Sequence, residues 1–259
     1  MTRQRVLLQP AYVLHQRAYR DTSAILELFT PEHGRVGVIA RGVRGKKPRW
    51  PALLQGFQPL LVSWLPGGEL GLLITAEAQG AALTISPPFI ASGFYLNEIL
   101  LRLLQRHDAQ LELFGCYDAA LRELAALGTT AESSAVEICL RRFEMRLLAA
   151  LGYGLVLDQD VHSAVPVQAQ QQYRYYLEQG PVLAETDDGN LDPFGIPVSG
   201  QALLAMQADD WSADTTRRAA KHLLRAVLGH YLGSKPLASR QLMRQSAQLT
   251  QRAQQRKDL

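Results

Sequence analysis

The first 80 residues alternate between apolar and polar positions with a period of two, and turn-forming residues interrupt the alternation. Strands are predicted at 11–15, 23–29, 34–41, 60–65 and 70–78. Pro66-Gly67-Gly68 marks a hairpin between the last two of these strands. Five short strands fit a small closed barrel, of which the OB-fold is the commonest five-stranded form. An SH3-like barrel would satisfy the same pattern, so the strand pattern leaves both open.

The period becomes helical after Ser86-Pro87-Pro88, which predicts a domain boundary there. Helices are predicted from 89 to about 104, at 111–127, 133–151, 199–207 and 215–232, and from 239 to 256. Residues 158–196 lose periodicity, which predicts an irregular insertion with a short hairpin at 173–177 and 181–184. We therefore expect an α+β protein with a barrel domain at 1–80 and a mainly helical domain at 86–259.

Positive charge is concentrated in two parts of the chain, although the formal net charge is only +3. Residues 35–49 carry six basic residues and 215–257 carry ten, and neither stretch contains an acid. Residues 50–214 carry seven basic and twenty acidic residues. Two basic blocks around an acidic middle indicate a polyanionic partner that contacts both ends of the chain.

The first basic block follows the third predicted strand, among the breakers Gly42, Gly45 and Pro48 and beside Trp50. Its members are Arg35, Arg41, Arg44, Lys46, Lys47 and Arg49. A dense, acid-free run of cations beside an aromatic ring favours contact with a phosphate backbone over a solvated loop tip.

The second block lies on the last long helix and in the loop after it. Its candidate DNA-binding residues are Arg217, Arg218, Lys221, Lys235 and Arg240. A glycine, a hydroxyl and two cations between 233 and 240 have the composition of a phosphate-contacting loop. An ordinary basic surface helix explains the same residues equally well.

Two further clusters allow a functional and a structural interpretation. Arg141, Arg142 and Arg146 lie beside Phe143 on one predicted helix, where they would suit an acidic peptide that ends in an aromatic residue. From these residues alone, a solvated helix face is favoured. The tyrosines at 173, 175 and 176 could stack on bases, but the core of a small hairpin is the preferred interpretation.

The enzyme classes with short signatures find no support. Gly45-Lys46 lacks the earlier glycine and the following hydroxyl of a phosphate-binding P-loop. The six histidines are scattered, and Cys116 and Cys139 lack metal-ligand spacing, so free thiols and no metal or cofactor are expected. No apolar run is long enough for a signal peptide or a membrane span. We expect a cytoplasmic protein that is not an enzyme and does not contact membranes.

An ordered set of short segments resembles the bacterial RecO family of recombination mediators over essentially the whole chain. These segments are Tyr12-Val-Leu-His15, Asp21-Thr-Ser23, Leu28-Phe-Thr30, His33-Gly-Arg35, Ala40-Arg-Gly42-Val-Arg44, Leu53-Leu-Gln-Gly-Phe-Gln-Pro-Leu60, Tyr95-Leu-Asn-Glu98, Leu140-Arg-Arg-Phe-Glu144, Leu151-Gly-Tyr-Gly154, Tyr231-Leu-Gly-Ser-Lys-Pro-Leu237 and Ser239-Arg240.

The resemblance implies an N-terminal OB-fold, a helical C-terminal domain, and binding to single- and double-stranded DNA with annealing of complementary strands. It implies RecR as a partner, RecA as an indirect partner, and a site for the acidic C-terminal tail of the single-strand-binding protein SSB. The basic residues of the first block would hold DNA. Arg141, Arg142, Phe143 and Arg146 would hold the SSB tail. The resemblance also implies a bacterial protein that associates with the nucleoid.

The sequence departs from this family at one point. Some members carry a four-cysteine zinc module after the segment that corresponds to Leu151-Gly-Tyr-Gly154, but this chain has no cysteine beyond Cys139. The 158–196 segment is therefore expected to lack zinc ligands. The alternative to a DNA-binding mediator is a protein–protein scaffold whose basic blocks meet acidic partners.

Overall fold

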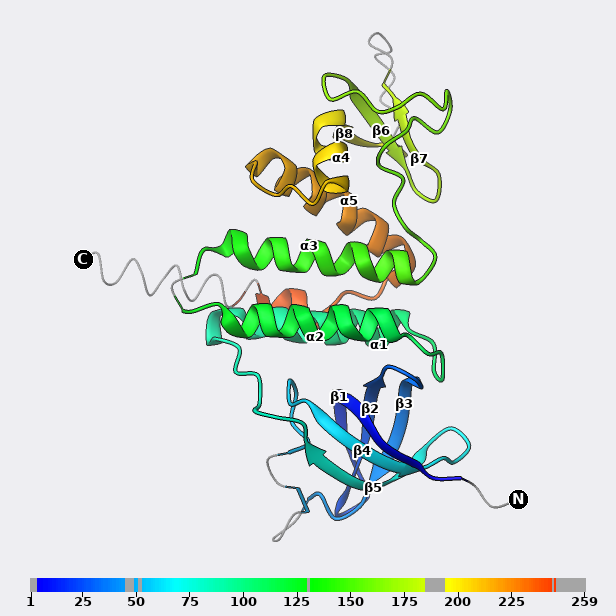
Figure 1. The fold of residues 1–259 in the computed structure, drawn as a ribbon, viewed down its shortest axis with the longest axis vertical. Helices are drawn as coiled ribbons and strands as arrows, with labels where there is room; N and C mark the ends of the chain where they lie inside the picture. Colours follow the sequence, from blue (N-terminus) through cyan, green and yellow to red (C-terminus); the bar gives the residue numbers. More distant parts are fainter. Residues whose placement is uncertain are drawn as a thin grey trace, which may run out of the picture. The chain divides into compact units, whose positions relative to one another are not determined.

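The fold was obtained as a computed structural model that describes residues 4–44, 49–50, 53–129, 131–184, 194–243 and 245 (Figure 1). The chain forms two compact units. The first unit comprises residues 1–132 and 235–259, and the second comprises residues 133–234. Lys46 and Lys47 of the predicted DNA-binding set lie outside the described residues.

The first unit begins with a closed barrel of β1 (Val6–Tyr19), β2 (Ser23–Thr30), β3 (Gly34–Ala40), β4 (Leu60–Leu65) and β5 (Gly71–Ala78). The strand order is β1-β2-β3-β5-β4, and β4 pairs with β1 to close the barrel. β3 and β5 are parallel, whereas the other neighbours are antiparallel. This order is that of an OB-fold, so the first of the two barrel predictions is confirmed.

The barrel interior is formed by the alternating apolar residues that predicted the strands. Leu26 and Val38 face each other across β2 and β3, and both are fully buried. β1 is longer than predicted, because its first half pairs with β4 and its second half pairs with β2. Residues 15–18 of β1 are exposed and mostly polar, so the hydrophobic pattern did not show the last residues of the strand.

After a short 3-10 turn η1 (Pro87–Phe89), helices α1 (Ile90–Leu103) and α2 (Leu111–Ala126) pack against the barrel. Phe114 and Tyr117 of α2 contact the rings of Tyr12 and Phe29, with centroids 5.2–5.8 Å apart. The Tyr117 hydroxyl donates to Asn97, whose amide donates to the Leu14 carbonyl. The barrel and the first two helices therefore share one core, although the period of the sequence changes between them.

The second unit contains α3 (Ser133–Ala150), α4 (Gly200–Gln207) and α5 (Asp214–Leu232), with a small sheet of β6 (Gln172–Tyr176), β7 (Gly180–Leu183) and β8 (Ile196–Ser199). The strand order is β7-β6-β8 (Figure 1). The predicted hairpin is β6–β7, whereas β8 was missed because it spans four residues and contains a proline.

The tyrosines of β6 support the core of this small sheet. Tyr173 and Tyr175 are each 3% exposed, and their hydroxyls accept hydrogen bonds from the backbone N–H groups of Gln168 and Val156. The prediction that these tyrosines form a hairpin core is confirmed for both. The Asp160 carboxylate, also buried, accepts three backbone hydrogen bonds and so orders the loop before the sheet.

In the parts of the chain that the structure describes, no helix is long and apolar enough to cross a membrane. Within the same residues, no group of three or more His, Cys, Asp and Glu side chains is placed to hold a metal ion. Cys116 and Cys139 are free thiols.

Candidate nucleic-acid interface

The first basic block lies at one end of the barrel because of strand register. Ala24, near the start of β2, pairs with both Ala18 of β1 and Ala40 of β3. The β1–β2 turn therefore lies beside the loop that leaves β3. Arg44 connects them, since its backbone N–H donates to the Thr22 carbonyl at 3.0 Å and its guanidinium to the Arg20 carbonyl at 3.3 Å.

Arg49 folds back onto the same end of the barrel. Its backbone N–H donates to the Gly42 carbonyl, and its guanidinium donates to the Ile74 carbonyl of β5 at 3.0 Å. The guanidinium also lies 4.1 Å from the centre of the Trp50 ring, a cation–π arrangement. These contacts orient the charge without neutralising it, because neither a carbonyl nor an aromatic ring carries a net negative charge.

Two arginines that the sequence interpretation missed lie at this end. Arg17 is exposed near the end of β1, and Arg20 is exposed in the turn, 5.2 Å from the centre of the Tyr19 ring. The antiparallel pairing of β1 with β2 would have located both, had the length of β1 been predicted. The barrel-end cluster is defined as Arg17, Arg20, Arg41, Arg44 and Arg49, all of them exposed.

The barrel-end cluster keeps its positive charge. Within the described residues, no carboxylate oxygen lies within 4.0 Å of a guanidinium nitrogen of any of its five members. Asp21 in the β1–β2 turn is exposed and is the acid closest to them in sequence. Five exposed guanidiniums with two neighbouring aromatic rings can contact successive phosphates and stack on bases.

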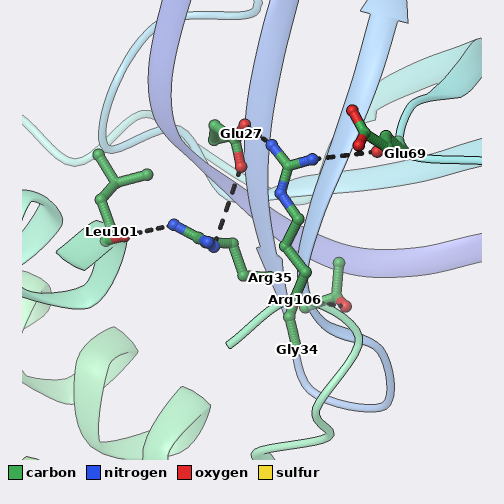
Figure 2. Close-up of polar contacts among 7 residues, drawn as sticks. Glu27, Gly34, Arg35, Glu69, Leu101 and Arg106 are labelled. Atoms are coloured by element: carbon green, nitrogen blue, oxygen red, sulfur yellow. Dashed lines mark hydrogen bonds and ion pairs between the residues drawn. The ribbon is translucent and has the colours of Figure 1, made fainter. Parts of the chain in front are cut away.

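Arg35 belongs to a different structure, although it was predicted with the others (Figure 2). Its guanidinium donates to the Leu101 carbonyl near the end of α1, and its Nε lies 4.0 Å from a carboxylate oxygen of Glu27. The Arg35 side chain is 20% exposed, and burial lowers its pKa. Arg35 therefore holds α1 against the barrel.

Arg106 completes this arrangement from the segment between α1 and α2 (Figure 2). Its guanidinium lies across β3 and donates to the Glu27 carboxylate and to the Glu69 carbonyl. Gly37 is opposite Glu27 in the register, and a side chain there would crowd the Arg106 guanidinium at 3.1 Å. The Arg35–Glu27–Arg106 clamp thus uses two cations around one carboxylate inside the first unit.

The candidate residues on α5 have carboxylate partners. Arg218 pairs with Asp214 at 2.6 Å, and Lys221 pairs with Glu137 of α3. Arg217 donates to the carbonyls of residues 211 and 212, and its side chain is 18% exposed. The opposite face of the helix, with Leu224 and Leu228, is buried.

Lys235 and Arg240 lie in the first unit, where their segment packs on α1. The Lys235 carbonyl accepts a hydrogen bond from Arg102, and the Arg240 guanidinium lies 5.8 Å from the centre of the Tyr95 ring. A helical turn begins at residue 238, and its first backbone N–H groups donate to the carboxylate of Glu98. These donors, which could have bound a phosphate, are already occupied by Glu98.

The arginines of α3 point in different directions. Arg141 is 11% exposed at its side chain and pairs with the buried Glu144. Arg142 donates to both oxygens of Asp209 at 2.9 and 3.0 Å. Phe143 is 2% exposed and belongs to the core. The structure therefore leaves Arg142 on the surface beside Asp209, with the exposed Arg146 four residues further along the same helix.

The comparisons with known proteins agree with this architecture. Residues 4–81 match the family described as "Recombination protein O N terminal", and residues 89–241 match "Recombination protein O C terminal". A DNA repair protein RecO from Nitrosospira multiformis is 45% identical over 249 residues, covering 95% of this chain and 98% of the relative. Relatives with the same name from Methylococcus capsulatus and Coxiella burnetii are 44% and 41% identical, over 94% and 92% of this chain and 95% and 98% of their own lengths.

Proposed function

Because the chain belongs to the recombination protein O (RecO) family of DNA repair proteins, we propose that it binds DNA through the barrel-end cluster and anneals complementary strands. The observation that carries the proposal is the set of five exposed guanidiniums at one end of an OB-fold, none of them paired with a carboxylate within the described residues. The recognition does not depend on base sequence, since phosphate contacts carry no sequence information.

The proposed mechanism is electrostatic and requires no covalent step. Bound cations displace the counterions that surround each strand, and this release drives binding. Two strands held on one cationic surface repel each other less than they do in solution, so complementary segments can meet. Arg20 and Arg49 lie over aromatic rings, which places flat surfaces for base stacking beside the phosphate contacts.

We further propose that the protein acts on strands coated with SSB, with RecR as a partner and RecA as the protein that is loaded in consequence. The surface for the acidic SSB tail would be the exposed pair Arg142 and Arg146 on α3. A tail carboxylate would exchange with Asp209 for the Arg142 guanidinium. Phe143 would support this surface from the core, and Arg141 would act through its pair with Glu144.

The test is annealing of two complementary oligonucleotides, either bare or coated with SSB, using SSB with and without its acidic tail. We expect acceleration on bare strands, and on coated strands only when the tail is present. Acceleration with either form of SSB would keep the DNA-binding proposal and remove the tail site. If neither bare nor coated strands anneal faster, and single-stranded DNA is not retained, a scaffold for acidic protein partners becomes the better explanation.

A further inference from the structure

The second unit contains a cavity of about 260 Å³ that the proposed DNA-binding surface does not use. Its walls come from the segment 152–156 after α3, from the β6–β7 turn and from the end of α5. All of these elements belong to one compact unit. The cavity therefore depends on contacts within that unit alone.

Three tyrosines give the cavity its chemical character. The rings of Tyr153 and Tyr231 stack in parallel, with centroids 3.9 Å apart and an interplanar angle of 17°. Both rings line the cavity, and Tyr153 is 44% exposed. Tyr175 also lines the cavity and is buried, and its hydroxyl accepts a hydrogen bond from the backbone N–H of Val156 at 3.2 Å. Aromatic faces carry partial negative charge.

The charged group at the rim is also negative. Glu178 lies in the β6–β7 turn, and one of its carboxylate oxygens is 3.3 Å from Nε2 of His230. The Glu178 side chain is 62% exposed, so the carboxylate remains open to another partner. The residues that line the cavity, all of them within the described part of the chain, include neither Lys nor Arg. Burial and the nearby Glu178 charge raise the pKa of Tyr231.

We propose that this cavity, the tyrosine pocket, binds an arginine or lysine side chain presented by a partner protein. A cation over the face of Tyr153 would gain a cation–π contact, and the Glu178 carboxylate would accept its N–H hydrogen bonds. A guanidinium suits the site better than an ammonium, because it is planar and can stack on a ring while its edge faces a carboxylate. Phosphates and acidic peptide tails have the wrong charge for these groups.

This inference does not rest on the proposed DNA binding. The tyrosine pocket and the barrel-end cluster share no residue, and their electrostatic preferences are opposite. A variant of the pocket should therefore leave binding to single-stranded DNA unchanged, so that failure of one proposal can be distinguished from failure of the other.

The experiment is an NMR titration of the full-length, isotopically labelled protein with the peptide acetyl-Ala-Arg-Ala-amide. The matched probe is acetyl-Ala-citrulline-Ala-amide, which has nearly the same shape but no charge. With the arginine peptide, we expect saturable chemical-shift changes of the Gly152, Gly154 and Gln179 amides and a dissociation constant in the millimolar range. With the citrulline peptide, we expect no such changes. Equal shifts with both peptides, or none with either, would overturn the proposal.

Variants at exposed positions connect the shifts to the pocket. Tyr153→Ala and Glu178→Gln should each lower the affinity for the arginine peptide by roughly threefold to fivefold, as expected when an exposed cation–π or charge contact is lost. Tyr153→Phe keeps the ring and should bind as the wild type does. Stronger shifts of the same amides with deoxycytidine monophosphate than with the arginine peptide would show that the stacked rings hold a base, and would reject the protein partner.

Discussion

The barrel end and the surface of helices α3 and α5 are both rich in basic residues, but they differ in what surrounds the charges. At the barrel end, Arg44 and Arg49 donate to backbone carbonyls, and Arg20 and Arg49 lie over rings. On α3 and α5, Arg142, Arg218 and Lys221 each contact a carboxylate. A count of basic residues therefore does not measure free positive charge, because the acids that neutralise it can come from distant parts of the chain.

The largest expected effect follows from reversing charge at the barrel end. Arg20→Glu with Arg44→Glu should weaken binding to single-stranded DNA by about 25-fold or more near 0.1 M salt, since each lost phosphate contact on a single strand contributes a slope of about 0.7 in log affinity against log salt. Fluorescence anisotropy over a range of salt concentrations measures both the affinity and its dependence on salt. The slope should become less steep by about 1.4 when two contacts with a single strand are lost.

The matched control carries the same change of charge on the other surface. Arg218→Glu with Lys221→Glu should change the affinity for DNA by less than about threefold, because Asp214 and Glu137 already neutralise these side chains. Equal losses in the two double variants would mean that net charge alone governs binding, and the comparison between the two surfaces would fail.

The next effect concerns stability and separates Arg35 from the cluster with which it was predicted. Arg35→Ala should lower the free energy of unfolding by about 2 kcal/mol, because it removes a partly buried cation that holds α1 and borders Glu27. Chemical denaturation measures this loss. Arg41→Ala at an exposed position should change stability by less than about 0.5 kcal/mol.

For DNA binding, the order of the same two variants should be reversed. Once allowance is made for the folded fraction, Arg35→Ala should leave the salt dependence of single-stranded DNA binding unchanged, whereas Arg41→Ala should make its slope less steep by about 0.7. If Arg35→Ala instead reduced the slope while leaving stability intact, Arg35 would belong to the DNA surface, and the clamp in Figure 2 would be incidental.

Much of the first unit could be predicted because its hydrophobic pattern is local. Strand β4 (Leu60–Leu65) begins and ends at the predicted residues, and β2 (Ser23–Thr30) differs from its prediction by one residue. What could not be predicted depends on pairing between distant residues. Arg106 is 79 residues from Glu27, and Asp209 is 67 residues from Arg142, so no local pattern shows that these charges are paired.

A smaller effect, this time a gain of affinity, tests the surface of α3. Asp209→Asn should strengthen binding of an acidic peptide that ends in phenylalanine by about threefold, because it removes the carboxylate that competes for Arg142. Burial raises the pKa of Asp209, but hydrogen bonds from Arg142 and Trp211 and the charge of Arg146 lower it by more. Asp210→Asn, at the adjacent exposed residue, should have no effect.

The smallest effect concerns the helical turn that begins at residue 238, where an internal carboxylate occupies a position suited to a phosphate. Burial raises the pKa of Glu98, but hydrogen bonds from Ser239 and Ala238 outweigh this effect, so the pKa lies below its usual value. A folded-state pKa below the unfolded value means that the stabilisation is present above the unfolded pKa and is lost as the pH falls through the folded pKa. As the pH falls below about 5, protonation of Glu98 should therefore lower the free energy of unfolding of the wild type by about 1 kcal/mol or less.

Glu98→Gln should remove that part of the acid dependence, which a comparison of denaturation at several pH values would detect. The same variant lets us ask whether the donors at residue 238 and Ser239 can bind phosphate once the carboxylate is neutral. If the affinity for DNA does not change in Glu98→Gln, Lys235 and Arg240 belong to a segment whose role is to hold the chain on α1. If it rises, the turn is a second phosphate site that Glu98 normally blocks.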